Sequence, residues 1–481
     1  MNKPRTIDGQ WWIHGDDKPA HFGVLSFDPE RGLELTVKIP QDRNSAEAFV
    51  ALFQAQGAPI AASGPRGPEN TITRILERTT TGIEIPNVIH GRDEHNYPVT
   101  LFGCSCVRPG VSTGLDVYNI DCLAAILDFQ GNSWREACFK SARVNYTLLH
   151  DWMNPGGGVE RLNKRQEIEL NERARLEIEG ASLVNQSHDE VRTKYLHYAS
   201  FEFTTALTVR QIRDEYACVF QRLLCLLTGE RVFIEEIRLF DAANAAEATG
   251  LHPLGSELLT PNSTVADARL HKHADEMIAS FKEIEADSKL IVKRWFECHK
   301  RLEPVLDLQF AVLFGLVATL DSEFLFLAQA MEVYHARSNL FRPREMPNDA
   351  HRERVRAILE KAPDEYQDWL KEKLAFANQK TLAQRLGEIL DLHRTEAEKL
   401  IAGINDFAAK VRYTRNYLTH YSEESRQSGK VARGNELLRI TYALNALLKI
   451  CMLKELGIHG EPIERIVRKH SRMRFVELDP G

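Results

Sequence analysis

An arginine, an asparagine and a histidine lie close together in residues 415–420, RNYLTH. Histidine changes its charge near neutral pH, so it can take up and release a proton during a reaction. Arginine keeps its charge and offers a fixed fork of donors to phosphoryl oxygens, and asparagine can orient either group. Together these residue types suit phosphoryl transfer, with His420 as general acid/base, Arg415 as phosphate stabiliser and Asn416 as orienting residue.

The spacing of arginine and histidine does not by itself select this segment. An arginine followed, after four to six intervening residues, by a histidine occurs six times in the chain. The other five pairs are Arg143/His150, Arg192/His197, Arg294/His299, Arg344/His351 and Arg465/His470. Only Arg415 is directly followed by asparagine, so Asn416 selects one candidate out of six.

Each of the three side chains also has an ordinary structural explanation. Arg415 could be a surface ion-pair partner and Asn416 a solvated helix residue. His420 could simply lie at a helix C-terminus, where the helix dipole favours positive charge. Short motifs also arise by chance, so the setting of the motif must decide between the two interpretations.

The motif lies on a predicted helix over residues 396–421 with a clear buried stripe. The stripe comprises Leu400, Ile404, Phe407, Val411 and Leu418. Asn416 and His420 share a face of this helix, whereas Arg415 is rotated by about 100 degrees from Asn416. Either the long Arg415 side chain reaches across the helix, or a second copy of the helix completes the site.

The rest of the C-terminal third is also predicted to be helical. Apolar residues recur at helical spacing in residues 310–336, 352–375, 381–393, 396–421 and 436–456. Acidic residues interrupt the most apolar stretch, 305–333, so we interpret it as a buried helix and expect no membrane span. These segments predict an antiparallel α-helical bundle.

The N-terminal half is predicted to be rich in strands. Strands are expected over 22–27, 33–39 and 99–107, with Cys104 and Cys106 on one face of the last, and loops over 57–68 and 154–158. Residues 159–180 are dense in charge and predict an exposed helix or linker. A strand (195–206), a helix (209–227) and a strand (232–240) follow. Trp11 and Trp12 could stack on a ligand, although core packing fits a strand start better.

These patterns predict an α+β protein with three parts. The first is a β-rich, sandwich-like domain over 1–155, the second an α/β part with a linker helix over 156–300, and the third the helical bundle over 301–481. A chain of 481 residues is too long for one ordinary core, and 43% hydrophobic residues indicate a folded protein.

Charge and cysteines restrict the classes of protein and site. The net charge of -7 argues against a protein that coats nucleic acid non-specifically through an overall positive field, so any RNA contact must be local. The eight cysteines form no C-x-x-C pair, which disfavours a structural zinc site. The N-terminal sequence MNKPRTIDGQWW lacks the apolar core of a signal peptide, and we expect a cytoplasmic protein.

The segment 411–421, VRYTRNYLTHY, resembles the corresponding stretch of ApeA-type HEPN proteins of bacterial anti-phage defence. Residues 325–337 are similar to an earlier HEPN helix in that family, in which an acidic residue faces the catalytic helix. Glu332 is the residue that matches it, unless it lies on the exposed side of its own helix. Residues 9–12, 22–27, 33–35, 99–101 and 222–229 resemble the ApeA N-terminal domain, so the resemblance covers most of the chain.

The resemblance implies a metal-independent endoribonuclease with no cofactor. In this chemistry the RNA 2′-hydroxyl attacks the adjacent phosphate and leaves 2′,3′-cyclic phosphate and 5′-hydroxyl ends. The family pairs two HEPN domains around one cleft, which implies a homodimer. The expected partners are RNA, as a single strand or a tRNA loop, and an activator derived from phage, while the N-terminal half senses a signal or restrains the nuclease.

Few basic residues near the motif could hold an RNA backbone. They are Lys410, Arg412 and Arg426. A second basic run, Arg465, Arg468, Lys469, His470, Arg472 and Arg474, extends this surface or is simply solvated. The alternative function is a binding protein, in which the bundle serves dimerisation or RNA docking and the β-rich half recognises a ligand.

Overall fold

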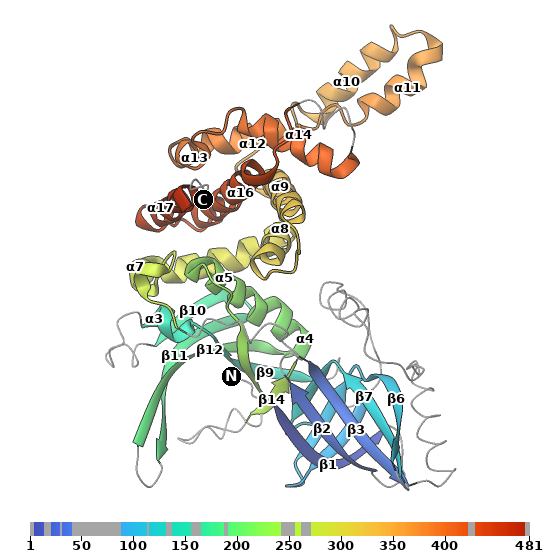
Figure 1. Ribbon diagram of the computed structural model, residues 1–481, viewed down its shortest axis with the longest axis vertical. Helices are drawn as coiled ribbons and strands as arrows, with labels where there is room; N and C mark the ends of the chain where they lie inside the picture. The colour runs from blue at the N-terminus through green and yellow to red at the C-terminus, as the bar shows by residue number, and fades with distance from the viewer. Residues whose placement is uncertain are drawn as a thin grey trace. The chain divides into compact units, whose positions relative to one another are not determined.

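The computed structural model describes residues 4–13, 21–28, 31–40, 88–112, 115–130, 137–154, 165–186, 191–241, 255–260, 271–421 and 429–476. The chain forms two compact units, Met1–Lys282 and Glu283–Gly481. The first is built on strands and the second on helices (Figure 1), which confirms the predicted fold class. The predicted boundary at residue 155 stays a prediction.

The strands of the first unit belong to one antiparallel sheet. Within the described ranges their order is β10-β11-β12-β9-β13-β14-β8-β5-β4-β1-β2-β3-β7-β6. Their bounds are β1 Arg5–Ile13, β2 His21–Asp28, β3 Gly32–Pro40, β4 Val88–Asp93, β5 Pro98–Phe102, β6 Ser105–Ser112, β7 Leu115–Cys122, β8 Ala124–Leu127, β9 Cys138–Tyr146, β10 Gln166–Asn171, β11 Ala174–Gln186, β12 Val191–Thr208, β13 Ile234–Phe240 and β14 Ser256–Leu259.

Alternation of apolar and polar residues builds the core of this sheet. In β2 and β3, Leu25, Phe27, Leu35 and Val37 are buried, because every second side chain points to the same face. Trp11 is buried with them, and its indole nitrogen donates to the carbonyl of Gly23 at 3.1 Å. The structure therefore places Trp11 in the core, the role that the sequence favoured.

A helical segment packs against β9 and β12. It begins with α4 (Val209–Gln211), continues through a π-helical turn, η2 (Ile212–Ala217), and ends with α5 (Cys218–Thr228). Its position is set by side chains, since the Tyr146 hydroxyl donates to the carbonyl of Ala217 at 2.8 Å and Phe220 packs on Tyr146. The helix predicted over 209–227 is thus confirmed, as are the strands predicted on either side of it.

The second unit is a helical bundle arranged around α9. Its helices are α8 Ser288–Leu313, α9 Leu320–Arg337, α10 Asn348–Leu359, α11 Asp364–Leu374, α12 Leu382–Leu392, α13 Arg394–Ile401, α14 Phe407–His420, α16 Gly434–Glu455 and α17 Glu461–Val476. Helix α9 contacts α8, α12, α14 and α16. In Figure 1, α10 and α11 form a hairpin that projects from the other helices of this unit.

Three of the predicted bundle helices are interrupted, so their predicted extents were wrong. The segment 310–336 breaks after Leu313, where Gly315 has φ of +67°. The segment 352–375 divides into α10 and α11 before Asp364, with Pro363 at the start of α11. The segment 396–421 divides into α13 and α14, because Gly403 and Asp406 both adopt left-handed backbone conformations.

Two predictions for the N-terminal half were also wrong. Residues 166–186 form the strands β10 and β11 rather than a helix or linker, since their charged residues alternate with buried ones such as Ile168 and Leu176. The strand predicted over 99–107 breaks at Gly103, whose φ is +62°, so Cys104 precedes β6 instead of sharing a strand face with Cys106. The predicted loop over 57–68 lies outside the described residues, as does most of the one over 154–158.

Candidate active site

Helix α14 carries the motif and turns one face to the bundle. Its buried residues are Phe407, Val411, Thr414 and Leu418, which lie along one side of the helix as the sequence predicted for three of them. The Thr414 hydroxyl accepts a hydrogen bond from the backbone nitrogen of Ala432 at 2.9 Å, inside the bundle. Helix α14 is therefore fixed by its apolar stripe and by one polar contact to the segment that precedes α16.

Arg415 lies between Glu332 of α9 and Asn416 of its own helix. Its Nη2 atom is 3.4 Å from Glu332 Oε2, and its Nη1 atom donates to Asn416 Oδ1 at 3.3 Å. The two charged side chains are partly exposed, at 39% for Arg415 and 27% for Glu332. Glu332 thus faces α14 rather than only solvent. The guanidinium group is oriented by both neighbours, while part of its surface stays open to a ligand.

His420 is the last residue of α14 and its side chain is exposed. Within the described ranges it forms no hydrogen bond or ion pair, in contrast to Arg415. The structure therefore brings together Arg415, Asn416 and Glu332, and His420 forms no hydrogen bond or ion pair with these three residues. This agrees with the helical geometry, since five positions along an ideal helix rotate a side chain by about 140 degrees.

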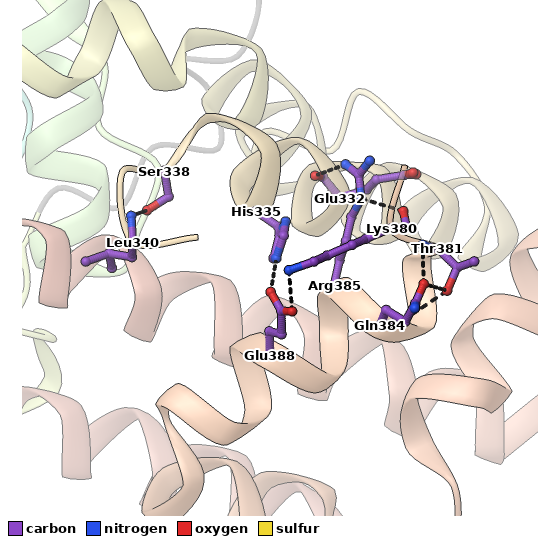
Figure 2. Close-up of polar contacts among 9 residues, drawn as sticks. All are labelled: Glu332, His335, Ser338, Leu340, Lys380, Thr381, Gln384, Arg385 and Glu388. Carbon is purple, nitrogen blue, oxygen red and sulfur yellow. Dashed lines mark hydrogen bonds and ion pairs between the residues drawn. The ribbon is translucent and has the colours of Figure 1, made fainter. Parts of the chain in front are cut away.

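A polar cluster lies behind Glu332 and joins α9 to α12 (Figure 2). Arg385 Nη1 donates to the main-chain carbonyl of Glu332 at 3.2 Å, and Arg385 Nε donates to the carbonyl of Lys380 at 2.9 Å. His335 and Lys380 both contact the carboxylate of Glu388. The main chain of Glu332 is thus held by a buried arginine, which restricts where its carboxylate can lie.

The charge states of this cluster follow from burial and from its contacts. Burial lowers the pKa of His335, against the opposing effect of Glu388. Burial alone would raise the pKa of Glu388, but hydrogen bonds from Lys380 and His335 outweigh it, and the pKa lies below its usual value. A carboxylate can only accept, so His335 Nε2 carries the hydrogen of their 2.8 Å contact.

Sequence reasoning missed this cluster. His335 and Glu388 are 53 positions apart and belong to no recognisable motif. The single local signal was the start of α12, where Thr381 and Gln384 form a capping box. That signal predicts a helix beginning there but not the residues that the helix would meet.

The predicted RNA-binding residues have different surroundings. Lys410 forms an ion pair with Glu436 of α16, so its charge is already compensated. Arg412 lies over the ring of Tyr413, with 4.6 Å from its guanidinium carbon to the ring centroid. Arg426 lies outside the described residues.

The second basic run is largely used within its own unit. Arg465 pairs with Glu283 at 2.8 Å, and Arg468 pairs with Glu461. His470 is buried, and its Nε2 atom donates to the carbonyl of Leu400 at 3.0 Å. The His470 contact joins α17 to α13, and the two ion pairs leave less of the run for a ligand.

Comparison with known families covers most of the chain. Residues 6–295 match the family described as ApeA N-terminal domain 1, and residues 325–462 match the family described as Apea-like HEPN. The chain belongs to the ApeA family of HEPN proteins. The match confirms the resemblance noted in the sequence and places this ApeA-type chain among HEPN proteins of anti-phage defence. Glu332, Arg415, Asn416 and His420 all lie within the HEPN match.

Neither the curated proteins nor the solved structures contain a match to this ApeA-type chain. In the part of the chain that the structure describes, no helix is long and apolar enough to cross a membrane.

Proposed function

We propose that this protein is an endoribonuclease that cleaves RNA without a metal ion. The observation that carries the proposal is the position of Arg415, which is held between Glu332 and Asn416 and remains partly open. An arginine oriented in this way presents a fixed fork of donors to a phosphate. The match to the Apea-like HEPN family supports the assignment.

The chemistry needs a proton carrier and a cation. The 2′-oxygen of the RNA bonds to the adjacent phosphorus and the bond from phosphorus to the 5′-oxygen breaks. His420 takes the proton of the 2′-hydroxyl and later supplies one to the departing 5′-oxygen. Arg415 stabilises the charge that accumulates on the phosphoryl oxygens. The products are a 2′,3′-cyclic phosphate and a 5′-hydroxyl, with no water or cofactor consumed.

The first prediction concerns the two residues that would touch the reacting groups. Arg415→Ala and His420→Ala should each reduce RNA cleavage by roughly a hundredfold or more, since each removes a principal catalytic contribution. The measurement is sequencing of RNA ends after incubation with purified protein, scored for cyclic phosphates.

Matched controls separate chemistry from folding. Arg394→Ala removes an arginine that is 69% exposed and paired with Asp391, and His459→Ala removes another exposed histidine of the same unit. Both should cleave as the unchanged protein does, and so should a sample treated with EDTA. Undiminished cleavage by the Arg415→Ala, His420→Ala double variant would overturn the mechanism.

The wider role follows from the family and the two units. We propose that the β-rich unit senses an activator derived from phage, or restrains the nuclease until one appears, and that the protein acts in the cytoplasm as a homodimer on single-stranded RNA or tRNA loops. Phage protection should then be lost with the same two substitutions. Protection that survives them would favour the alternative, a binding protein whose bundle only docks or dimerises.

A further inference from the structure

Three tyrosines lie one helical turn apart along α14 and its C-terminus. They are Tyr413, Tyr417 and Tyr421, and the rings of the last two meet edge to face with centroids 5.6 Å apart. On an ideal helix Tyr413 and Tyr417 lie within about 60 degrees of His420, and Tyr413 lies about 160 degrees from Arg415. Tyr413 and Tyr417 therefore line the flank of α14 that faces away from Arg415, and His420 lies on the same flank.

Cations lie over two of these rings. The Arg412 guanidinium carbon is 4.6 Å and the Lys430 ammonium nitrogen 5.0 Å from the centroid of Tyr413, and the Arg433 guanidinium carbon is 5.3 Å from the centroid of Tyr417. A ring face attracts a cation and orders it without neutralising its charge. The rings thus hold positive groups in place beside the motif.

Two of these cations, Arg412 of α14 and Arg433 at the start of α16, differ from Lys410 and Arg415 of α14. Arg415 and Lys410 are paired with carboxylates, Glu332 and Glu436. Arg412 and Arg433 form no ion pair with any carboxylate among the residues that the structure describes. Within the described ranges no carboxylate compensates their charge, although the whole chain carries a net charge of -7. A local positive surface of this kind attracts a polyanion to this flank of α14.

Tyr421 is the exposed end of the aromatic row. Its side chain is 64% exposed, and its backbone has φ of +50°, the left-handed conformation that normally favours glycine at the end of a helix. A tyrosine held there costs roughly 1 kcal/mol or more of folding free energy. A large aromatic side chain that is both strained and exposed, directly after His420, is therefore poorly explained by stability.

We infer that this aromatic flank binds unpaired RNA, with one base stacked on Tyr421 and the neighbouring phosphates held by Arg412 and Arg433. The inference rests on the proposed ribonuclease function and specifies how its substrate is held. Every base has a flat face that can stack on an aromatic ring, and backbone phosphates match the ordered cations. The flank has the two features that a single strand requires.

The stacked base also explains why cleavage would favour single strands. In a duplex the bases are paired inside the helix and cannot reach a ring on a protein surface. A base drawn out onto Tyr421 would leave its phosphate beside His420, the residue that directly precedes it. The splayed backbone could then align the 2′-hydroxyl with the departing 5′-oxygen, which a regular helix does not allow.

The test is the affinity for a fluorescein-labelled single-stranded oligoribonucleotide, measured by anisotropy in a His420→Ala protein that cannot cleave it. Tyr421→Gly should weaken binding roughly tenfold, because stacking of one base is lost. Tyr421→Phe keeps the ring and should retain the affinity. Tyr366→Ala, which removes an exposed tyrosine of α11, is the matched control. A duplex of the same sequence should bind weakly to all four proteins.

Glycine suits the left-handed backbone of residue 421, so Tyr421→Gly should not lower the unfolding temperature, and lost binding cannot be attributed to unfolding. Replacing Arg412 and Arg433 by alanine should reduce the slope of log affinity against log salt by about 1.4, since two phosphate contacts to a single strand are lost.

Several outcomes would overturn the inference. Unchanged affinity of the Tyr421→Gly protein would show that no base stacks there. A changed oligomeric state of that variant in size-exclusion chromatography, with unchanged affinity, would show that the ring contacts a second copy instead. Ring-dependent binding by a protein that never cleaves RNA would contradict the ribonuclease proposal alone, whereas cleavage with ring-independent binding would contradict only the stacking site.

Discussion

The contact between Arg415 and Glu332 is too weak to be explained as a stabilising ion pair. Its 3.4 Å separation is long, and both side chains are partly exposed, a setting in which such pairs contribute about 0–1 kcal/mol. A long contact of this kind can still orient the guanidinium, whose remaining N–H donors can bind a phosphate. We therefore expect Glu332 to matter for cleavage far more than for folding.

Substitution of Glu332 separates these two roles. Glu332→Gln keeps the size of the side chain and removes its charge, so Arg415 should lose its orientation and single-turnover cleavage should fall roughly tenfold. The free energy of unfolding should change by less than about 1 kcal/mol. Glu398→Gln, on the exposed side of α13, is the control and should change neither quantity. A large loss of stability, or an unchanged cleavage rate, would contradict this assignment.

At the scale of single residues, the sequence predicted the site only in part. Asn416 selected the motif from six candidates, and the family resemblance led to Glu332, which the structure places against Arg415. The left-handed backbone of Tyr421 could not be predicted, because nothing in its residue type indicates it. The burial of His335 beside Glu388 depends on the packing of α9 on α12, which local patterns do not report.

At the scale of elements, periodicity found the helices but not their ends. Apolar spacing continued across the breaks at Gly315 and Gly403 because the flanking helices bury faces in the same bundle. Pro363, Gly315 and Gly403 are residue types that often end helices. They also occur inside helices, and the backbone angles that they adopt depend on tertiary contacts, so they did not predict the breaks. Residues 166–186 were misassigned for a different reason. Their many charged residues made the alternation of buried and exposed side chains, which is typical of a strand, hard to recognise in the sequence.

The junction of α12 and α13 offers a prediction about pH. His393 lies at this junction, is buried, and has no hydrogen-bond partner for either ring nitrogen among the described residues. Burial, followed by the nearby charge of Lys454, lowers its pKa from 6.5 to about 4. Between pH 6.5 and about 4, His393 is therefore protonated in the unfolded chain and neutral in the folded chain. The stability that His393 contributes is full above pH 6.5 and is lost as the pH falls from 6.5 through about 4.

His393→Leu removes this dependence and keeps a buried side chain of similar size. Between pH 7 and pH 4.5, the stability of the unchanged protein relative to this variant should fall by about 2.5 kcal/mol. The measurement is hydrogen exchange of the α12 and α13 amides in the two proteins at the same pH, which cancels the pH dependence of chemical exchange. If the difference in stability between the two proteins stayed the same at both pH values, His393 would have the same pKa in the folded and the unfolded chain, which would contradict this prediction.

At the scale of the whole molecule, the sequence predicts a β-rich and a helical part. It does not predict whether one chain supplies all the residues of the site. Composition and period separate the two halves, because strands and helices repeat at 2 and 3.6 residues. Within the described residues of one chain, Arg415 forms polar contacts with Glu332 and Asn416, whereas His420 forms no hydrogen bond or ion pair with any of the three. A site that needs both Arg415 and His420 at one phosphate is more readily formed by two copies of α14 than by one.

Mixing two inactive variants tests whether the site is shared between chains. The Arg415→Ala and His420→Ala proteins should each be inactive, but a pair made of one chain of each keeps one cleft with an intact arginine from one chain and an intact histidine from the other. After exchange of subunits half of the dimers are mixed. In each mixed dimer one of the two pairs of Arg415 and His420 in the shared cleft is intact, so about a quarter of the original cleavage should return. The same mixture prepared with a chain carrying both substitutions should stay inactive. If the mixed variants also stay inactive while size-exclusion chromatography shows that subunits exchange, each chain builds its own site, and Arg415 must swing across α14 to reach the phosphate beside His420.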